Sequence, residues 1–349
     1  MQSSSQNSGK PFQSMSSKNN CPVAISLGDP AGIGPEISLK AACTLSKQSF
    51  RRPLLLIGDK PLLEQASRHC SERVNIETWK GYSESGGIYF LETGSLRKKA
   101  TPGQHSKEYG LASFSYFLQA WELLQEKKVS ALVTAPISKT AWHKAGIYFP
   151  GHTEAIKVFT GEKTEMLMAT KKLRVLLATT HIPLQHLWKH LTSRRLVEAA
   201  LSATAFCTQY YSPPVRIGVC GLNPHAGESN TMGSEETDII LPAIETLQKK
   251  GINAEGPFPS DTLFHSALSN PRFTFILALY HDQGMIPLKT FFSRSLVNIS
   301  TSLQWIRTSP GHGTAFDIAH KGLADPSSMI EAIRTASRFS RIKEKHDSV

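Results

Sequence analysis

Short apolar runs alternate with amphipathic stretches along most of this chain. The apolar runs, rich in Val, Ile and Leu, are typical of strands that are buried on both faces of a sheet. The stretches between them repeat their apolar residues at the spacing of a surface helix. The predicted strands span 23–27, 53–57, 129–133, 173–180, 215–220 and 273–280, and the predicted helices span 36–46, 109–127, 194–210, 235–250 and 329–342.

This alternation favours a three-layer α/β fold with a largely parallel sheet. The chain has 349 residues, enough for two domains. It contains no internal repeat and no long linker, so we expect the two domains to interleave in sequence. Residues 1–20 are rich in Ser, Gln and Asn and are predicted to form a disordered tail.

Composition excludes several classes of protein. No apolar stretch approaches the roughly 20 residues that a membrane helix needs, and the N-terminus lacks the apolar centre of a signal peptide. The five cysteines form no C-x-x-C pair, which indicates a reduced, cytoplasmic setting. The net charge of +11 suggests anionic partners, but Lys and Arg are scattered and no nucleic-acid-binding motif is present. We therefore expect an anionic small substrate and a dinucleotide, with no nucleic-acid or membrane partner.

Three of the apolar runs end in a histidine within a polar motif: His181, His225 and His281. In open α/β sheets, ligands bind beyond the carboxyl ends of the strands. Neutral imidazoles bind borderline divalent metals, and three of them with open positions are typical of a catalytic metal site. The alternative for each histidine is a solvated or hydrogen-bonded residue at a strand end.

Several other motifs are candidates for binding an anion. Residues 28–36 (GDPAGIGPE) follow a strand and open a helix, where free amides hold anions, although a tight structural turn explains them as well. His152 and Thr153 contact a phosphate or carboxylate, or begin a helix. Lys289, Asn298 and Arg307 either grip an anion or are ordinary surface groups.

Two acidic positions have similar alternatives. Asp261 either caps the next helix or contacts an amine. Asp317, in the small-residue loop 307–319, either accepts from a ribose hydroxyl or begins a helix.

Taken together, the motifs resemble the 4-hydroxythreonine-4-phosphate dehydrogenase family of vitamin B6 biosynthesis. The resemblance extends from Val23 to the last predicted helix, in the family's order. It implies an isocitrate/isopropylmalate dehydrogenase-like fold with a cleft between two domains, and an obligate homodimer whose active sites lie at the interface. The motifs that carry it are GDPAGIGPE, TAPISK, GHTE, GLNPHAGE, PSDTLF, YHDQG and RTSPGHGTAFDIA.

The resemblance also assigns roles to domains and residues. Residues 21–135 with 290–349 become the cofactor-side domain, and 136–289 the metal, substrate and dimerisation domain. The implied metal ligands are His181, His225 and His281; the substrate contacts are His152, Thr153, Lys289, Asn298 and Arg307; the near-site carboxylates are Asp261 and Asp282; and the adenosine contacts are Gly313, Thr314 and Asp317.

The implied activity is oxidation of 4-phosphooxy-L-threonine by NAD or NADP with a divalent metal (Zn, Mg or Co). The oxidised product, 2-amino-3-oxo-4-phosphooxybutanoate, then loses carbon dioxide to give 3-amino-2-oxopropyl phosphate. The general base is open among Asp282, Asp261 and a metal-bound water. The alternatives are a dehydrogenase of a four-carbon sugar-acid phosphate such as erythronate or threonate 4-phosphate, a phosphate acyltransferase, and a non-catalytic metal- or phosphate-binding module.

The chain departs from the family pattern at three places. Gly311 stands where the family usually has Asp, His320 where it usually has Gly, and residues 301–304 (TSLQ) where Leu-Gly-Leu-Pro is commoner. These departures leave cofactor preference and the fit of the substrate open.

Overall fold

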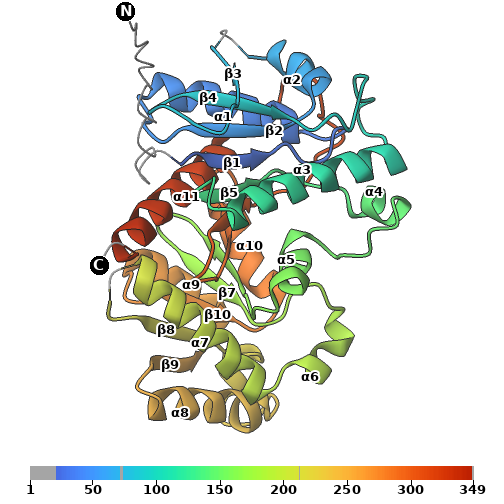
Figure 1. The fold of residues 1–349 in the computed structure, drawn as a ribbon. Coiled ribbons are helices and arrows are strands. Elements are labelled where there is room, and N and C mark those ends of the chain that lie inside the picture. Colours follow the sequence, from blue (N-terminus) through green and yellow to red (C-terminus); the bar gives the residue numbers. More distant parts are fainter. Residues whose placement is uncertain (1–20, 71–73, 212, 348–349) are drawn as a thin grey trace, which may run out of the picture.

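A computed structural model describes residues 21–70, 74–211 and 213–347. The predicted disordered tail, 1–20, lies outside the described residues. The described chain forms one sheet of twelve strands covered by helices on both faces (Figure 1).

One half of the sheet is parallel throughout. Its strands follow the order β3-β4-β2-β1-β5-β12, so the last strand of the chain pairs with β5 near the middle of the sheet. The bounds are β1 Val23–Ser26, β2 Leu54–Gly58, β3 Glu77–Thr78, β4 Ile88–Glu92, β5 Ala131–Thr134 and β12 Arg307–Pro310.

The other half joins β12 through antiparallel pairs. Strand β11 pairs antiparallel with both β12 and β6, and β6 pairs antiparallel with β7. Beyond β7 the order β10-β8-β9 is parallel again. The bounds are β6 Met166–Ala169, β7 Arg174–Leu177, β8 Arg216–Cys220, β9 Asn253–Phe258, β10 Phe275–Ala278 and β11 Val297–Ser300.

Alternating side chains of the buried strands pack into two separate apolar clusters. Val23 and Ile25 belong to the cluster on the side of α1 and α11, whereas Ala24 belongs to the cluster that contains Phe117 of α3. This is the expected result of the two-residue period of a strand between two helical layers. The helices of this half are α1 Gly34–Lys47, α2 Lys60–Ser67, α3 Lys107–Gln125, α4 Lys139–Lys144, α5 His152–Thr160 and α11 Ser327–His346.

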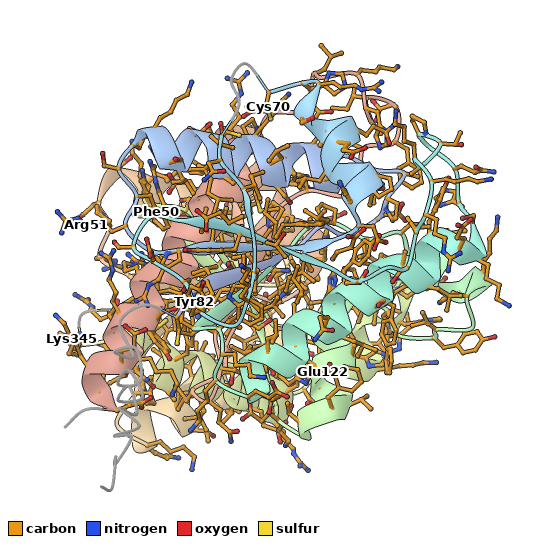
Figure 2. All side chains as sticks on the ribbon, turned by 45° about the horizontal axis from the view of Figure 1, so that its top comes forward. Phe50, Arg51, Cys70, Tyr82, Glu122 and Lys345 are labelled. Carbon is orange, nitrogen blue, oxygen red and sulfur yellow. The ribbon has the colours of Figure 1, made fainter. Side chains whose placement is uncertain are left out.

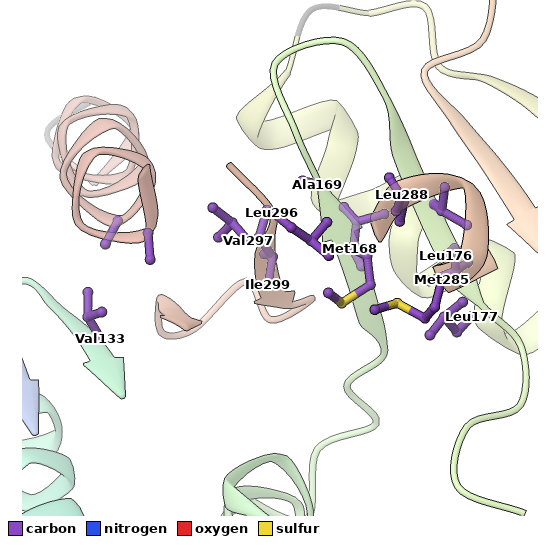
Figure 3. Close-up of a cluster of buried hydrophobic side chains, with 14 of the residues drawn as sticks. Val133, Met168, Ala169, Leu176, Leu177, Met285, Leu288, Leu296, Val297 and Ile299 are labelled. Carbon is purple, nitrogen blue, oxygen red and sulfur yellow. The ribbon is translucent and has the colours of Figure 1, made fainter. Parts of the chain in front are cut away.

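Helix α10 packs closely on β6 and β7. Figure 3 shows Met285 and Leu288 of α10 in one apolar cluster with Met168 of β6 and Leu177 of β7. A Cβ on Gly284 would lie 2.6 Å from a methyl carbon of Leu177, so only glycine permits this approach. The other helices of this half are α6 Leu187–His190, α7 Ser193–Tyr210, α8 Leu241–Lys249, α9 Ser260–Ser269 and α10 His281–Phe292, with short turns η2 Leu184–His186, η3 Pro224–Gly227 and η4 Glu236–Ile240.

The α/β fold predicted from the hydrophobic pattern is confirmed. Every predicted strand and helix is present with its ends shifted by a few residues. The sheet is largely parallel, as predicted, although the antiparallel strands β6 and β11 were not themselves predicted. The predicted domain boundaries stay a prediction. Across the described ranges, every helix is too short or too polar to span a lipid bilayer.

Candidate functional site

A cavity of about 290 Å³ opens on one face of the sheet at the junction of its two halves. Residues after β5, the start of α5, β6, β11, β12 and α10 line it. Eight of the predicted site residues lie in its wall: His152, Thr153, His181, His281, Lys289, Asn298, Arg307 and Gly313.

Arg307 forms a buried positive pole in this cavity. Only 4% of the residue is exposed. Its guanidinium donates to the hydroxyl of Thr134 through Nη2 at 2.6 Å and to the hydroxyl of Thr153 through Nη1 at 3.2 Å. No carboxylate forms an ion pair with it in the described part of the chain. Burial lowers the pKa of Arg307 to about 10, and the charge of Glu154 opposes that shift. A buried cation that meets only hydroxyls is suited to an anionic ligand.

His152 is a neutral group beside that pole. Its ring meets Phe117 and Trp142 edge-on, at centroid distances of 4.9 and 5.4 Å. Burial, with a smaller effect of Arg307, holds the pKa of His152 well below the ordinary 6.5. Its Nε2 and the Oδ1 of Asn298 are buried and have no hydrogen-bond partner. Both residues line the cavity, so a polar ligand bound there would give these buried atoms the partners that such atoms normally have.

Helix α10 presents one face to the cavity. His281, Met285 and Lys289 are spaced by four residues and therefore share that face. The exposed Lys289 adds a second cation to the same cavity as Arg307. The cavity wall thus contains both a buried guanidinium and a solvated ammonium.

His181 and His281 lie together, as the strand pattern predicts. They follow β7 and β10, which are parallel neighbours, and their ring centroids are 5.7 Å apart. Burial lowers the pKa of His181, and Lys139 contributes, so the ring is neutral near pH 7. The Nδ1 of His281 is 2.6 Å from Oδ1 of Asp282, which orients the ring and leaves Nε2 for a ligand. These two imidazoles fit two positions of a metal site.

His225 does not line this cavity. It lies exposed in the turn after β8, where six consecutive residues, 225–230, have positive φ. Glu236 secures the start of this turn, because its Oε1 accepts from the backbone N–H groups of Leu222 and Asn223 at 2.7 and 2.8 Å. Within the ranges that the structure describes, no three His, Cys, Asp or Glu side chains are close enough to hold a metal ion. One chain therefore assembles two of the three predicted ligands.

The remaining predicted residues lie outside the cavity wall. Asp282 is exposed beside His281, and Asp261 is exposed in the first turn of α9, where its Oδ1 accepts from the N–H of Thr262 at 2.9 Å. Thr314 and Asp317 belong to a loop that packs on the turn 28–34, with the Ile33 N–H donating to the Thr314 carbonyl at 3.0 Å.

Glu154, Lys139 and His312 also line the cavity, although the sequence reasoning did not single them out. Each lies inside a motif already noted: Glu154 in GHTE, Lys139 in TAPISK and His312 in RTSPGHG. The motifs were therefore the available signal.

Two departures from the family pattern have local physical reasons. A Cβ on Gly311 would lie 2.6 Å from Cγ of Leu296, so the Leu296 side chain occupies the space that a larger residue needs. His320 has φ +60°, a conformation that glycine adopts freely. Its Nε2 lies 3.0 Å from the carbonyl oxygen of Pro30, and its Nδ1 contacts Gln65.

The chain is similar to known proteins over most of its length. A model of the family described as pyridoxal phosphate biosynthetic protein PdxA matches residues 49–336. A 4-hydroxythreonine-4-phosphate dehydrogenase of Sulfurihydrogenibium sp. is 39% identical over 92% of this chain and 99% of its own length. A D-threonate 4-phosphate dehydrogenase of Cupriavidus necator is 38% identical over 91% and 97% of the two chains.

Solved structures give the same result. The crystal structure of 4-hydroxythreonine-4-phosphate dehydrogenase from Klebsiella pneumoniae has a TM-score of 0.81 at 34% identity, covering 92% of this chain and 98% of that one.

Proposed function

The chain belongs to the PdxA family of pyridoxal phosphate biosynthetic proteins, and from this premise we propose that it oxidises 4-phosphooxy-L-threonine with NAD or NADP. The proposal rests on a cavity that contains a buried cation and buried polar atoms without hydrogen-bond partners. Arg307 is buried without a carboxylate, while His152 Nε2 and Asn298 Oδ1 lack partners. A phosphorylated hydroxy amino acid supplies the anion, the donors and the acceptors that these groups need.

We assign the phosphate and carboxylate of the substrate to Arg307, Lys289 and Thr153. Arg307 offers a rigid guanidinium, and Lys289 offers a mobile ammonium at the cavity's edge. Neutral His152 then contacts the substrate through Nε2, and Asn298 through Oδ1. Contacts to the non-reacting phosphate hold the reacting carbon in place, so their loss affects turnover as well as binding.

The metal is proposed to lie between His181 and His281 of one chain and His225 of the partner subunit. The exposure of His225 on its left-handed turn, and its absence from the cavity of its own chain, support sharing between two copies in a homodimer. When bound, Zn²⁺, Mg²⁺ or Co²⁺ supplies a Lewis acid for the substrate's hydroxyl oxygen. Asp282 orients His281 through the Nδ1 contact, whereas the exposure of Asp261 gives no support for a role in the same cavity.

A bound nicotinamide cofactor would supply the hydride acceptor for the hydroxyl-bearing carbon, and the hydroxyl proton would leave to solvent. The resulting β-keto acid exchanges its carboxylate for a proton and releases carbon dioxide, which gives 3-amino-2-oxopropyl phosphate. We propose that Gly313, Thr314 and Asp317 contact the adenosine end of the cofactor. The position of Gly313 in the cavity wall, with no atom of the described chain within 4 Å of an added Cβ, supports this proposal, because a ligand can approach the backbone there.

A second candidate is oxidation of D-threonate 4-phosphate, because relatives of nearly equal identity carry either name. The two substrates differ at one carbon, which bears an amine or a hydroxyl. The phosphate-binding groups serve both, so they do not separate the candidates.

The test incubates the purified chain with each substrate, with NAD or NADP, and with or without a chelator. We expect NAD(P)H from 4-phosphooxy-L-threonine and loss of turnover after chelation. If NAD(P)H forms with D-threonate 4-phosphate but not with 4-phosphooxy-L-threonine, the second proposal replaces the first. A requirement for coenzyme A in place of nicotinamide would instead identify a phosphate acyltransferase. Sedimentation tests the homodimer, and mixing His225→Ala with His281→Ala chains tests sharing, since only mixed dimers then contain one complete site.

A further inference from the structure

A second concave surface lies on the opposite face of the sheet from the candidate site. One hollow, of about 270 Å³, lies between the β6–β7 turn, Tyr211 and α11. Another, of about 500 Å³, lies between the end of α1 and α11. Both are lined by Arg334 and Arg338 of α11, and we call the two adjoining hollows together the α11 groove. Figure 2 labels Arg51 and Lys345 on this side of the molecule, where the loop after α1 approaches α11.

The strand register separates this groove from the candidate site. Met168 and Asn298 are register partners and face the candidate cavity. The next pair, Ala169 and Val297, lines the α11 groove. Neighbouring residues of a strand point to opposite faces, so the two sites lie back to back across β6 and β11.

The groove is strongly cationic. Its single carboxylate, Glu331, lies 3.4 Å from Lys171 and 3.0 Å from Arg334. Within the ranges that the structure describes, the other four cations of the groove form no ion pair. The six cationic side chains are Arg51, Lys171, Arg174, Arg334, Arg338 and Arg341. They hold much of the excess positive charge of the whole chain.

Two of the guanidiniums are held in place before any ligand arrives. The guanidinium carbon of Arg174 lies 4.6 Å from the Tyr211 ring centroid, and that of Arg338 lies 5.2 Å from it. Arg174 also donates through Nε to the carbonyl of Thr274 at 2.6 Å. Stacking on one ring limits the rotamers of both arginines, which lowers the entropic cost of binding an anion. The two stacked guanidiniums also cover the Tyr211 ring, so that ring is not free to stack on a nucleobase.

The spacing of the arginines indicates an extended anion. Arg334, Arg338 and Arg341 follow the i, i+4, i+7 pattern of one helix face. At 1.5 Å per residue this row extends for about 10 Å along α11, longer than a single phosphate group. We propose that the α11 groove binds the linear polyphosphate chain of a small molecule, whether inorganic or the tail of a nucleoside triphosphate.

Calorimetric titration of the purified full chain with inorganic triphosphate tests this proposal. Arg341→Ser removes a guanidinium that makes no ion pair in the described chain. It should weaken binding about fivefold, the upper range for one exposed ion pair. Arg338→Ser with Arg341→Ser should weaken it about twentyfold. The control is Arg68→Ser, an exposed arginine just after α2 that does not line the groove. It should bind within twofold of the parent chain, and melting curves should show that all variants are folded.

Three outcomes would overturn the proposal: no binding of triphosphate at 1 mM, equal binding by the Arg341→Ser and parent chains, or binding of a ten-nucleotide single strand more than tenfold tighter than triphosphate. The last result would identify a nucleic-acid surface. Equal affinity for ATP and triphosphate would support recognition of the phosphate chain alone. Tighter binding of ATP that Arg341→Ser weakens would support a nucleotide tail. Both supporting results concern the α11 groove alone, so they do not depend on which substrate the candidate site oxidises.

Discussion

Replacing Arg307 by Met is expected to stabilise the ligand-free chain and to abolish phosphate binding. Burial lowers the pKa of this guanidinium from 12.5 to about 10. The difference corresponds to about 3 kcal/mol by which the folded chain disfavours the charged group, since one pKa unit is about 1.4 kcal/mol. Met removes this cost but leaves the hydroxyls of Thr134 and Thr153 without their donor, which costs about 1–2 kcal/mol. The net gain is about 1–2 kcal/mol.

The pH dependence of this gain follows from the sign of the shift. Arg307 is charged in both the folded and the unfolded chain below about pH 10, so the penalty is constant across the neutral range. As the pH rises through the folded pKa, the parent chain sheds the proton and the penalty declines. The stability difference between Arg307→Met and the parent should therefore be flat from pH 6 to 9.

A matched control is available in Arg195. Its Nη1 donates to Oε1 of Glu165 at 2.7 Å, and its Nη2 donates to Oε2 of the same carboxylate. Because Glu165 is buried, Arg195→Met leaves an unpaired carboxylate. The expected loss is about 2–3 kcal/mol, below the full value for a buried pair because Arg195 is 29% exposed. The same substitution should thus change stability in opposite directions at the two positions.

Urea unfolding with and without 10 mM phosphate measures both effects. Phosphate should raise the stability of the parent chain by RT ln(1 + [phosphate]/Kd) and leave Arg307→Met unchanged. The reasoning fails if Arg307→Met unfolds at lower urea than the parent, or if phosphate stabilises both chains equally.

Three further changes test other features. Burial raises the pKa of Asp29 to about 6 from 3.8, so the ionised carboxylate destabilises the folded chain above that pH. Asp29→Asn should therefore raise the free energy of unfolding by up to about 3 kcal/mol at pH 8 and leave it unchanged below pH 4, as measured by urea unfolding at the two pH values. Gly311→Asp should cost about 2 kcal/mol by overpacking against Leu296, and a melting curve of the double variant with Leu296→Ala should show partial recovery. Glu236→Gln should weaken the anchoring of the turn at Asn223 by about 1–2 kcal/mol, seen as faster proteolysis at 225–230; an unchanged cleavage rate would contradict it.

The hydrophobic pattern predicted the helices and strands whose apolar residues repeat with a single helical or strand period. The buried runs before His181 and His281 became parallel neighbours, so these two rings meet as the strand-end rule predicts. His281 was expected after a strand, and the structure adds that it begins α10. That helix then brings Lys289 to the same cavity.

Other elements had no sequence signal of their own. Strand β6 (MLMA) contains no β-branched residue, and β12 (RTSP) is polar, so neither fits the usual strand composition. Strand β12 is nevertheless buried, because the Thr308 hydroxyl donates to the Ala332 carbonyl and Arg307 donates to Thr134. Such long-range polar bonds depend on the assembled fold. For the same reason, the sequence could not show that His225 lies apart from the other two histidines of its own chain.

The central position of β12 has a consequence for how the protein is made. Until residues 307–310 leave the ribosome, β5 has no partner on its inner side, and β11 has only β6. From the completion of β5 at Thr134 until β12 is made, the nascent chain carries an open sheet edge at β5, and open edges template association between chains. Residues 307–310 thus join the two halves of the sheet, and a ribosome that stalls before residue 307 leaves these halves unjoined.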